Sequence, residues 1–174
     1  MLSWTQKNRN GEDADEAPSV VKNIYRAQAG AEGRRFALRA DAQECLFYEY
    51  HPPFVTRESI LADMKALPPQ KQEADKFYVG FFGGEKLAAV LDLIVSYPDD
   101  SAAFIGFFMT DVQCQNQGVG TRIVTELCRS LKELGYKKVC LGVDKGNPQS
   151  RAFWTKNGFC RIGEKTYVLM ERQL

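Results

Sequence analysis

The chain has 174 residues, a length usual for one domain, so we expect a single hydrophobic core. Hydrophobic residues make up 44% of it and charged residues 26%, an ordinary globular composition that excludes a mostly disordered chain. The net charge is +1, from 23 basic and 22 acidic side chains, and because this gives no overall basic field we expect no nucleic-acid partner.

The N-terminal third carries several short helix and strand signals. Residues 1–18 are polar and include the acidic cluster GEDADEAP, so we expect a flexible tail there and one domain over residues 19–174. Alternation, capping residues and prolines predict the elements that follow. They are a helix over Ser19–Gly30, a strand over Arg34–Ala40, a helix over Asp41–Tyr50 that HPP at His51–Pro53 breaks, and a helix over Thr56–Leu67 that Pro68 and Pro69 stop.

The middle of the chain predicts a meander and then a long helix. The stretches FYVGFF, LAAVLDLIVSY and AAFIGFFMTD read as three strands, joined by turns at GGEK and PDDS. The glycine loop QNQGVG comes next. Apolar residues at helical spacing then predict a helix that runs through Leu134, with Gly135 just past its end.

A strand, a short helix and a hairpin complete the predicted elements. The segment Lys138–Asp144 is a strand of the buried type. Asn147 followed by Pro148 is a strong helix start, and Gly158 ends that helix. The segments Phe159–Glu164 and Thr166–Arg172 then predict a last hairpin.

The cysteines argue against a disulfide framework and against a metal site. They are odd in number and have no CxxC spacing, and only His51 could help them bind a metal. No signal-peptide pattern opens the chain, and the longest apolar stretches are about half of what spans a bilayer. We therefore expect a soluble cytoplasmic protein that needs no metal and has no membrane partner. The cysteines are Cys45, Cys114, Cys128, Cys140 and Cys160.

The glycine loop has the chemistry of a phosphate site. Gly118 and Gly120 let the backbone approach an anion closely, and the first N–H groups of the following helix have no partners within it. A nucleotide-triphosphate loop would need GxxxxGK, which is absent. A dinucleotide fingerprint would need glycine where Ile123 stands; Asp144 could serve as its ribose acid, but too little chain follows for such a sheet.

The loop also carries a family resemblance. Gln115-x-x-Gly118-x-Gly120 resembles the Q/R-x-x-G-x-G/A motif of the GNAT superfamily of acyl-CoA-dependent N-acyltransferases. NPQSRAFWTKNGF at Asn147–Phe159 resembles the family's N-x-x-A/S-x-x-FY-x-x-x-GF segment, and the resemblance is clear from Phe77. It implies an α/β fold with a mixed, mainly antiparallel sheet, flanking helices and a parallel pair at the fourth and fifth strands, Ala102–Thr110 and Lys138–Asp144. It also implies direct transfer of an acetyl group from acetyl-CoA to a primary amine.

The resemblance assigns residues to acetyl-CoA in three groups. Backbone N–H groups of the loop would hold the pyrophosphate, and the end of the preceding strand would pair with the pantetheine arm. There, main-chain groups of Met109 and Thr110 would contact the acyl group and its oxyanion. The start of the last helix would line the amide and thiol end. In chain order the positions are Met109, Thr110, Val112, Gln115, Asn116, Gln117, Gly118, Val119, Gly120, Thr121, Asn147, Ser150 and Phe153.

At one chemically important position the sequence departs from the family pattern. The tyrosine that many members use to protonate the departing thiolate aligns with Trp154, which cannot act as an acid. Cys160 or Tyr167 could replace it. Because a thiol has a pKa of about 8.5, loss of an acid would slow the reaction without preventing it.

The amine must also lose a proton. Asp92 is the leading candidate base, because it interrupts the apolar strand LAAVLDLIV, where an unpaired carboxylate would be costly. A salt-bridged or edge-facing aspartate is the alternative. Asp111 fits a turn residue, and His51 fits a structural position in its HPP turn as well as a base.

Two other functions are compatible with the sequence. One is a non-catalytic acyl-CoA sensor, which the tryptophan at position 154 motivates. The other is a dinucleotide-binding oxidoreductase. For an acetyltransferase we expect an acceptor amine on a small molecule or a peptide, and the resemblance is compatible with a homodimer.

Overall fold

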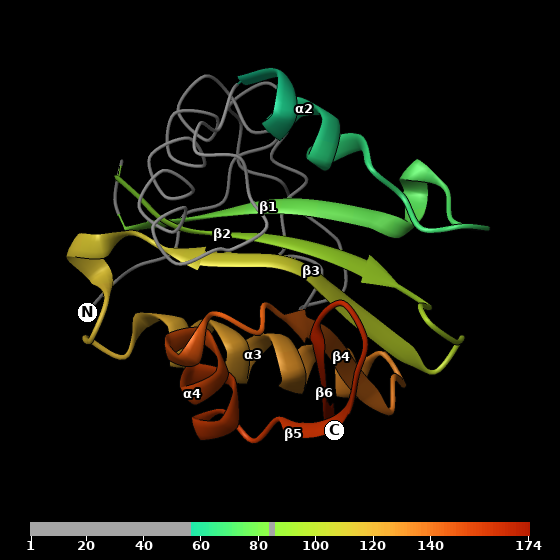
Figure 1. Ribbon diagram of the computed structural model, residues 1–174. Helices are drawn as coiled ribbons and strands as arrows, with labels where there is room; N and C mark the ends of the chain where they lie inside the picture. Colours follow the sequence, from blue (N-terminus) through green and yellow to red (C-terminus); the bar gives the residue numbers. More distant parts are fainter. Residues whose placement is uncertain (1–56, 84–85) are drawn as a thin grey trace.

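The computed structural model describes residues 57–83 and 86–174 (Figure 1). The tail and the elements predicted before Thr56, together with His51, lie outside the described residues. Short 3₁₀ turns at Glu73–Asp75 and Val112–Cys114 join longer elements. In chain order these are α2 (Arg57–Lys65), β1 (Lys76–Gly83), β2 (Lys86–Val95), β3 (Ala102–Thr110), α3 (Val119–Glu133), β4 (Lys138–Val143), α4 (Pro148–Lys156), β5 (Cys160–Glu164) and β6 (Val168–Gln173).

The six strands form one sheet in the order β1-β2-β3-β4-β6-β5. Strands β1, β2 and β3 pair antiparallel, as the meander predicts. Strands β3 and β4 pair in parallel, and α3 lies between them in the chain. Strand β6 pairs antiparallel with both β4 and β5. Over the described part of the chain, the predicted mixed sheet with one parallel pair and flanking helices is confirmed.

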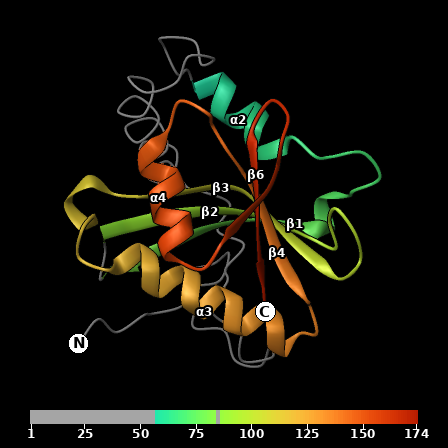
Figure 2. The same ribbon diagram turned by 60° about the horizontal axis from the view of Figure 1, so that its bottom comes forward.

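Helices cover both faces of the sheet. Helix α2 lies over β1–β3 on one side, which we call the α2 face, and α3 and α4 lie on the other, the α3 face (Figures 1 and 2). The main core is on the α3 face, where Val124, Leu127 and Leu131 of α3 join Leu91 and Leu141 in one buried cluster. No helix among residues 57–83 and 86–174 is long and apolar enough to cross a membrane.

The helix boundaries follow the local signals in the sequence. Gly135 and Gly158 follow α3 and α4 with φ of +91° and +83°, a left-handed conformation that glycine adopts at no steric cost. Asn147 caps α4, since its side-chain oxygen accepts a hydrogen bond from the Ser150 N–H at 2.8 Å, and Pro148 occupies the first turn. Capping and termination at these helix ends are therefore confirmed.

Strands β3 and β4 lie side by side over only four residues. Their register runs from Ala102 opposite Lys138 to Ile105 opposite Leu141. Beyond this point β3 continues to Thr110 along β2, and β4 continues to Val143 along β6. The two residues that follow the last pair, Gly106 and Gly142, are both exposed, and we call them the branch point. Past it, each strand presents an edge that the other does not pair with.

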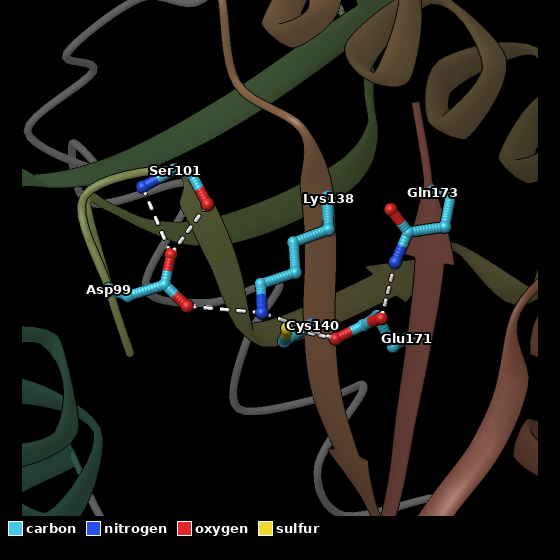
Figure 3. A network of polar contacts seen from close by, with 6 residues as sticks. All are labelled: Asp99, Ser101, Lys138, Cys140, Glu171 and Gln173. Atoms are coloured by element: carbon cyan, nitrogen blue, oxygen red, sulfur yellow. Dashed lines mark hydrogen bonds and ion pairs between the residues drawn. The ribbon is translucent and has the colours of Figure 1, made fainter.

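A polar network holds the other end of this strand pair together (Figure 3). Lys138 of β4 places its Nζ 3.0 Å from Asp99 Oδ2 in the β2–β3 turn and 3.6 Å from Glu171 Oε2 of β6. The second oxygen of Asp99 accepts hydrogen bonds from the N–H and hydroxyl of Ser101 at 3.0 and 2.7 Å. The hydrogen bonds from Ser101 and Lys138 lower the pKa of Asp99. The network fixes the turn relative to β4 and β6.

The cysteines of β4 and β5 should differ in reactivity. Burial, and then the charge of Glu171, raises the pKa of Cys140 to about 11, whereas Cys160 is exposed. Because the thiolate is the nucleophile, we expect iodoacetamide at pH 8 to label Cys160 and to leave Cys140 largely unmodified, as measured by peptide mass spectrometry. Both should react in denaturant. Equal labelling rates for the two in the native protein would contradict the burial described for Cys140.

Candidate functional site

The loop between β3 and α3 is held by its own side-chain amides. Gln115 donates from Nε2 to the Thr110 carbonyl at 3.1 Å, which ties the loop back to the end of β3. Gln117 donates from Nε2 to the Gln113 carbonyl at 2.6 Å. Asn116 has a φ of +57°, a left-handed conformation that asparagine tolerates better than most residues. Gln115 and Asn116 therefore shape the turn.

The loop ends in an exposed helix N-terminus. Gly118 is the N-cap of α3 with a φ of +78°, and no atom lies within 4 Å of the place where its Cβ would stand. No side chain caps α3 among the described residues, so the N–H groups of Val119, Gly120 and Thr121 begin the helix without a side-chain acceptor. These donors and the positive end of the helix dipole form an anion-binding arrangement.

Gly120 is the point where three predicted segments meet. A Cβ there would lie 3.1 Å from Thr110 Oγ1 of β3 and 3.2 Å from the Phe153 ring of α4. The Phe153 ring stacks on Phe108 of β3, with 5.9 Å between centroids. The start of α3 thus approaches β3 and α4 more closely than a side chain at position 120 would comfortably allow.

The end of β3 carries the other predicted contacts. Met109 is buried, and its side chain packs with Val90 on the α2 face. Val112 is exposed in the 3₁₀ turn beyond Thr110. Asp111 accepts a hydrogen bond from the Gln113 N–H at 2.8 Å, so its side chain acts as a turn cap. The main-chain groups of β3 from Gly106 onward lie along the edge that β4 leaves.

Two polar residues at the end of β4 have structural partners. Asn147 is buried and caps α4 by accepting a hydrogen bond from the Ser150 N–H. Asp144, the candidate ribose acid of a dinucleotide site, accepts a hydrogen bond from the Gly146 N–H at 2.7 Å. A loop hydrogen bond therefore accounts for an acid at the end of this strand without a nucleotide.

Asp92 lies in a buried ion pair, which is the salt-bridged alternative given above, and its partner is Lys76. Its Oδ2 is 3.0 Å from Lys76 Nζ, and this ammonium also donates to the carbonyls of Asp63 and Ala66, at the end of α2, at 2.9 and 2.6 Å. Among the described residues the buried Oδ1 has no hydrogen-bond partner. Burial raises the pKa of Asp92 against the opposing charge of Lys76. The sequence does contain a signal for this pair: Lys76 begins one apolar strand and Asp92 lies within the next.

Asp92 also lies beside the branch point. Strands β2 and β3 shift register between Asp92 and Leu93, and Gly106 is the extra residue of this bulge. A Cβ at Gly106 would come within 2.9 Å of Asp92 Oδ2. The carboxylate thus lies against the place where β3 and β4 part.

Comparison with known families agrees with this geometry. The model of the Acetyltransferase (GNAT) family matches residues 36–159, most of the chain. The chain belongs to the GNAT acetyltransferase family. No protein among the curated sequences matches it.

Solved structures share the GNAT fold at low sequence identity. An acetyltransferase from Thermus thermophilus has a TM-score of 0.67 and 18% identity, over 81% of this chain and 90% of that one. The PaiA N-acetyltransferase from Thermoplasma acidophilum, in complex with coenzyme A, has a TM-score of 0.61 and 16% identity, over 81% of this chain and 91% of that one. The ribosomal-protein-S18-alanine N-acetyltransferase from Escherichia coli has a TM-score of 0.58 and 15% identity, over 83% of this chain and 89% of that one.

Trp154, which stands at the tyrosine position of many GNAT members, belongs to the core. It is buried and its ring contacts Phe108, Phe153 and Phe159 with centroid distances of 5.7, 5.0 and 5.0 Å. The aromatic cluster positions Phe153 against the loop. In the part of the chain that the structure describes, no three His, Cys, Asp or Glu side chains gather where they could hold a metal ion.

Proposed function

We propose that this GNAT protein is an N-acetyltransferase that moves the acetyl group from acetyl-CoA directly to a primary amine. The observation that carries the proposal is the glycine-loop N-terminus of α3, which lies beside the edge of β3 that β4 leaves. One end of this arrangement suits a pyrophosphate and the other suits an extended amide chain. The related PaiA enzyme was crystallised in complex with coenzyme A, which supports the same ligand class here.

The proposed path of acetyl-CoA follows the chain geometry. The pyrophosphate would accept hydrogen bonds from the N–H groups of Gln117, Gly118, Val119, Gly120 and Thr121. The pantetheine arm would pair with main-chain groups of β3, running from Val112 and Thr110 toward the branch point. Asn147, Ser150 and Phe153 would line its other side. A main-chain N–H near Met109 would stabilise the oxyanion, a contribution of roughly 3–4 kcal/mol for one such donor.

The base in this proposal is Asp92. Lys76 holds one carboxylate oxygen, so the other, Oδ1, is left to accept a proton from the amine or from a bridging water. Its raised pKa makes Asp92 a stronger base than an exposed aspartate. The lone pair of the amine would then attack the thioester carbonyl from the α2 face, because the Asp92 side chain lies on that face, opposite the core residues Leu91 and Leu93. The acceptor would be an amine on a small molecule or a peptide.

The first test is thermal unfolding with acetyl-CoA, CoA, NAD and ATP. A ligand present at a hundred times its dissociation constant adds about 2.7 kcal/mol, which raises the melting temperature of a domain of this size by roughly 5–11 °C. We expect such shifts with acetyl-CoA and with CoA, and no shift with NAD or ATP. A shift with NAD or ATP and none with acetyl-CoA would overturn the proposal.

A second candidate is an acyl-CoA sensor, which the buried Trp154 at the acid position favours. The two functions differ in turnover. A panel of primary amines, including an alanine-initiated peptide and spermidine, is incubated with acetyl-CoA, and free CoA thiol is measured. An acetyltransferase releases CoA with at least one amine class, whereas a sensor binds acetyl-CoA and releases none.

A further inference from the structure

At the branch point each of the two glycines lies beside a polar side chain, Asp92 next to Gly106 and Tyr167 next to Gly142. Ile105 and Leu141 make the last β3–β4 pair, and Gly106 and Gly142 come directly after them. A Cβ at Gly106 would meet Asp92, as described above. A Cβ at Gly142 would lie 3.2 Å from the Tyr167 Cβ and 3.5 Å from its Cγ. Tyr167 thus occupies the space that a side chain of β4 would fill.

Tyr167 lies on the α2 face, together with Asp92. Val139, Leu141 and Val143 of β4 belong to the core on the α3 face, so the intervening Gly142 turns the opposite way. Asp92 alternates in the same manner with the core residues Leu91 and Leu93 of β2. The two polar side chains therefore flank the branch point on one face, one from each side.

The sheet order separates Tyr167 from the other candidate donor, Cys160. Cys160 is on β5, and β6 lies between β5 and β4, so about 10 Å separates its backbone from β4. Across the sheet, Cys160 pairs with Glu171, which pairs with Cys140, which in turn pairs with Phe104. Cys160 is therefore level with a part of the sheet where β3 and β4 are still paired. Of the two residues, only Tyr167 contacts β4 at the position where the strands part.

From this geometry we propose that Tyr167 donates a hydrogen bond to the sulfur of CoA as it leaves, an inference that rests on the proposed function. In the step, the amine nitrogen forms the C–N bond and the C–S bond of the tetrahedral intermediate breaks. The electron pair goes to sulfur and the amine proton goes to Asp92 or water. The phenol keeps its own proton, because phenols are weaker acids than thiols. Its O–H stabilises the negative charge that develops on sulfur.

The test measures the pKa of the CoA thiol in the complex and needs no acceptor. Thiolate absorbance is followed against pH for CoA bound to wild type, Tyr167→Phe and Tyr136→Phe, with desulfo-CoA complexes as blanks. Tyr136 is the matched control: its hydroxyl lies 3.4 Å from Ser96 Oγ, away from the branch point. We expect the thiol pKa to be about one pH unit lower in wild type and in Tyr136→Phe than in Tyr167→Phe.

A second variant moves the phenol without removing it. Because the Tyr167 Cβ cannot rotate away from a Cβ at position 142, Gly142→Ala should displace the ring and raise the thiol pKa as Tyr167→Phe does. Desulfo-CoA should bind wild type and Tyr167→Phe equally. If both proteins bind CoA and the thiol pKa is the same, the role of Tyr167 is wrong and the proposed function stands. If wild type does not bind CoA, the proposed function fails and this inference fails with it.

Discussion

Replacing Lys76 with methionine is expected to lower the free energy of unfolding by about 3–5 kcal/mol, the usual cost of removing one partner from a buried ion pair. Both side chains are at least nine-tenths buried, with exposed fractions of 7% for Lys76 and 10% for Asp92. The three hydrogens of the ammonium match its three acceptors: Asp92 and the carbonyls of Asp63 and Ala66. The substitution would leave a buried carboxylate without its cation and α2 without this bond to the sheet.

The loss should also depend on pH. Without Lys76 the pKa of Asp92 rises further, since burial already raises it in the wild type. The variant then takes up a proton at a higher pH than wild type does. The difference in unfolding free energy between the variant and wild type is therefore largest at neutral pH. It becomes smaller as the pH falls through the pKa of Asp92 in the variant.

Urea unfolding of four proteins measures this effect. Lys71→Met is the matched control, because the Lys71–Asp75 pair, 4.0 Å apart, is more exposed and should contribute about 0.5 kcal/mol or less. The double variant Lys76→Met/Asp92→Leu removes both charges and should recover much of the stability. A loss for Lys76→Met no larger than that for Lys71→Met would contradict the buried pair.

Replacing Gly120 with aspartate should weaken acetyl-CoA binding by at least a hundredfold. A side chain there meets Thr110 and Phe153, which would force the loop away from β3. The added carboxylate would also face the proposed pyrophosphate. At about 4 Å and an effective dielectric constant near 20, such a repulsion is of order 4 kcal/mol, which is more than a hundredfold in affinity. Calorimetric titration with acetyl-CoA gives the change in affinity.

The two ends of α3 supply a matched pair that separates folding from binding. Gly118 and Gly135 both have positive φ, +78° and +91°, and both would place a Cβ in open space. Alanine at either position should therefore cost a similar amount of stability, about 1–2 kcal/mol. Only Gly118→Ala should reduce affinity for acetyl-CoA. Unchanged affinity in both alanine variants and in Gly120→Asp would show that the loop does not hold the pyrophosphate.

Local signals in the sequence predicted most of the described elements. The apolar spacing of α3 matches its buried side, and Asn147, Pro148 and Gly158 set the limits of α4 because caps and left-handed glycines act over a few residues. The glycine loop is likewise held by contacts between near neighbours, from Gln115 to the Thr110 carbonyl and from Gln117 to the Gln113 carbonyl. These features depend on short-range chemistry.

The features that the sequence did not predict depend on register. The partner of Asp92 is Lys76 because the antiparallel pairing of β1 and β2 places Lys76 opposite Ile94, two residues from Asp92, and this register is not encoded in either strand alone. The contact between Gly142 and Tyr167 depends on β6 lying next to β4. The short length of the β3–β4 pairing likewise depends on how two distant strands meet.

The position of β6 in the sheet bears on how the chain folds during synthesis. Strand β6 follows both β4 and β5 in the chain, yet it lies between them in the sheet. Until residues 168–173 have left the ribosome, β4 lacks its partner along Gly142 and Val143, and β5 has no neighbour. The β1–β3 meander can form earlier, because its contacts are between neighbours in the chain. The β4–β6–β5 half of the sheet is therefore completed only after translation of its final strand, and a nascent chain stalled before residue 168 would expose the unpaired edge of β4 to chaperones.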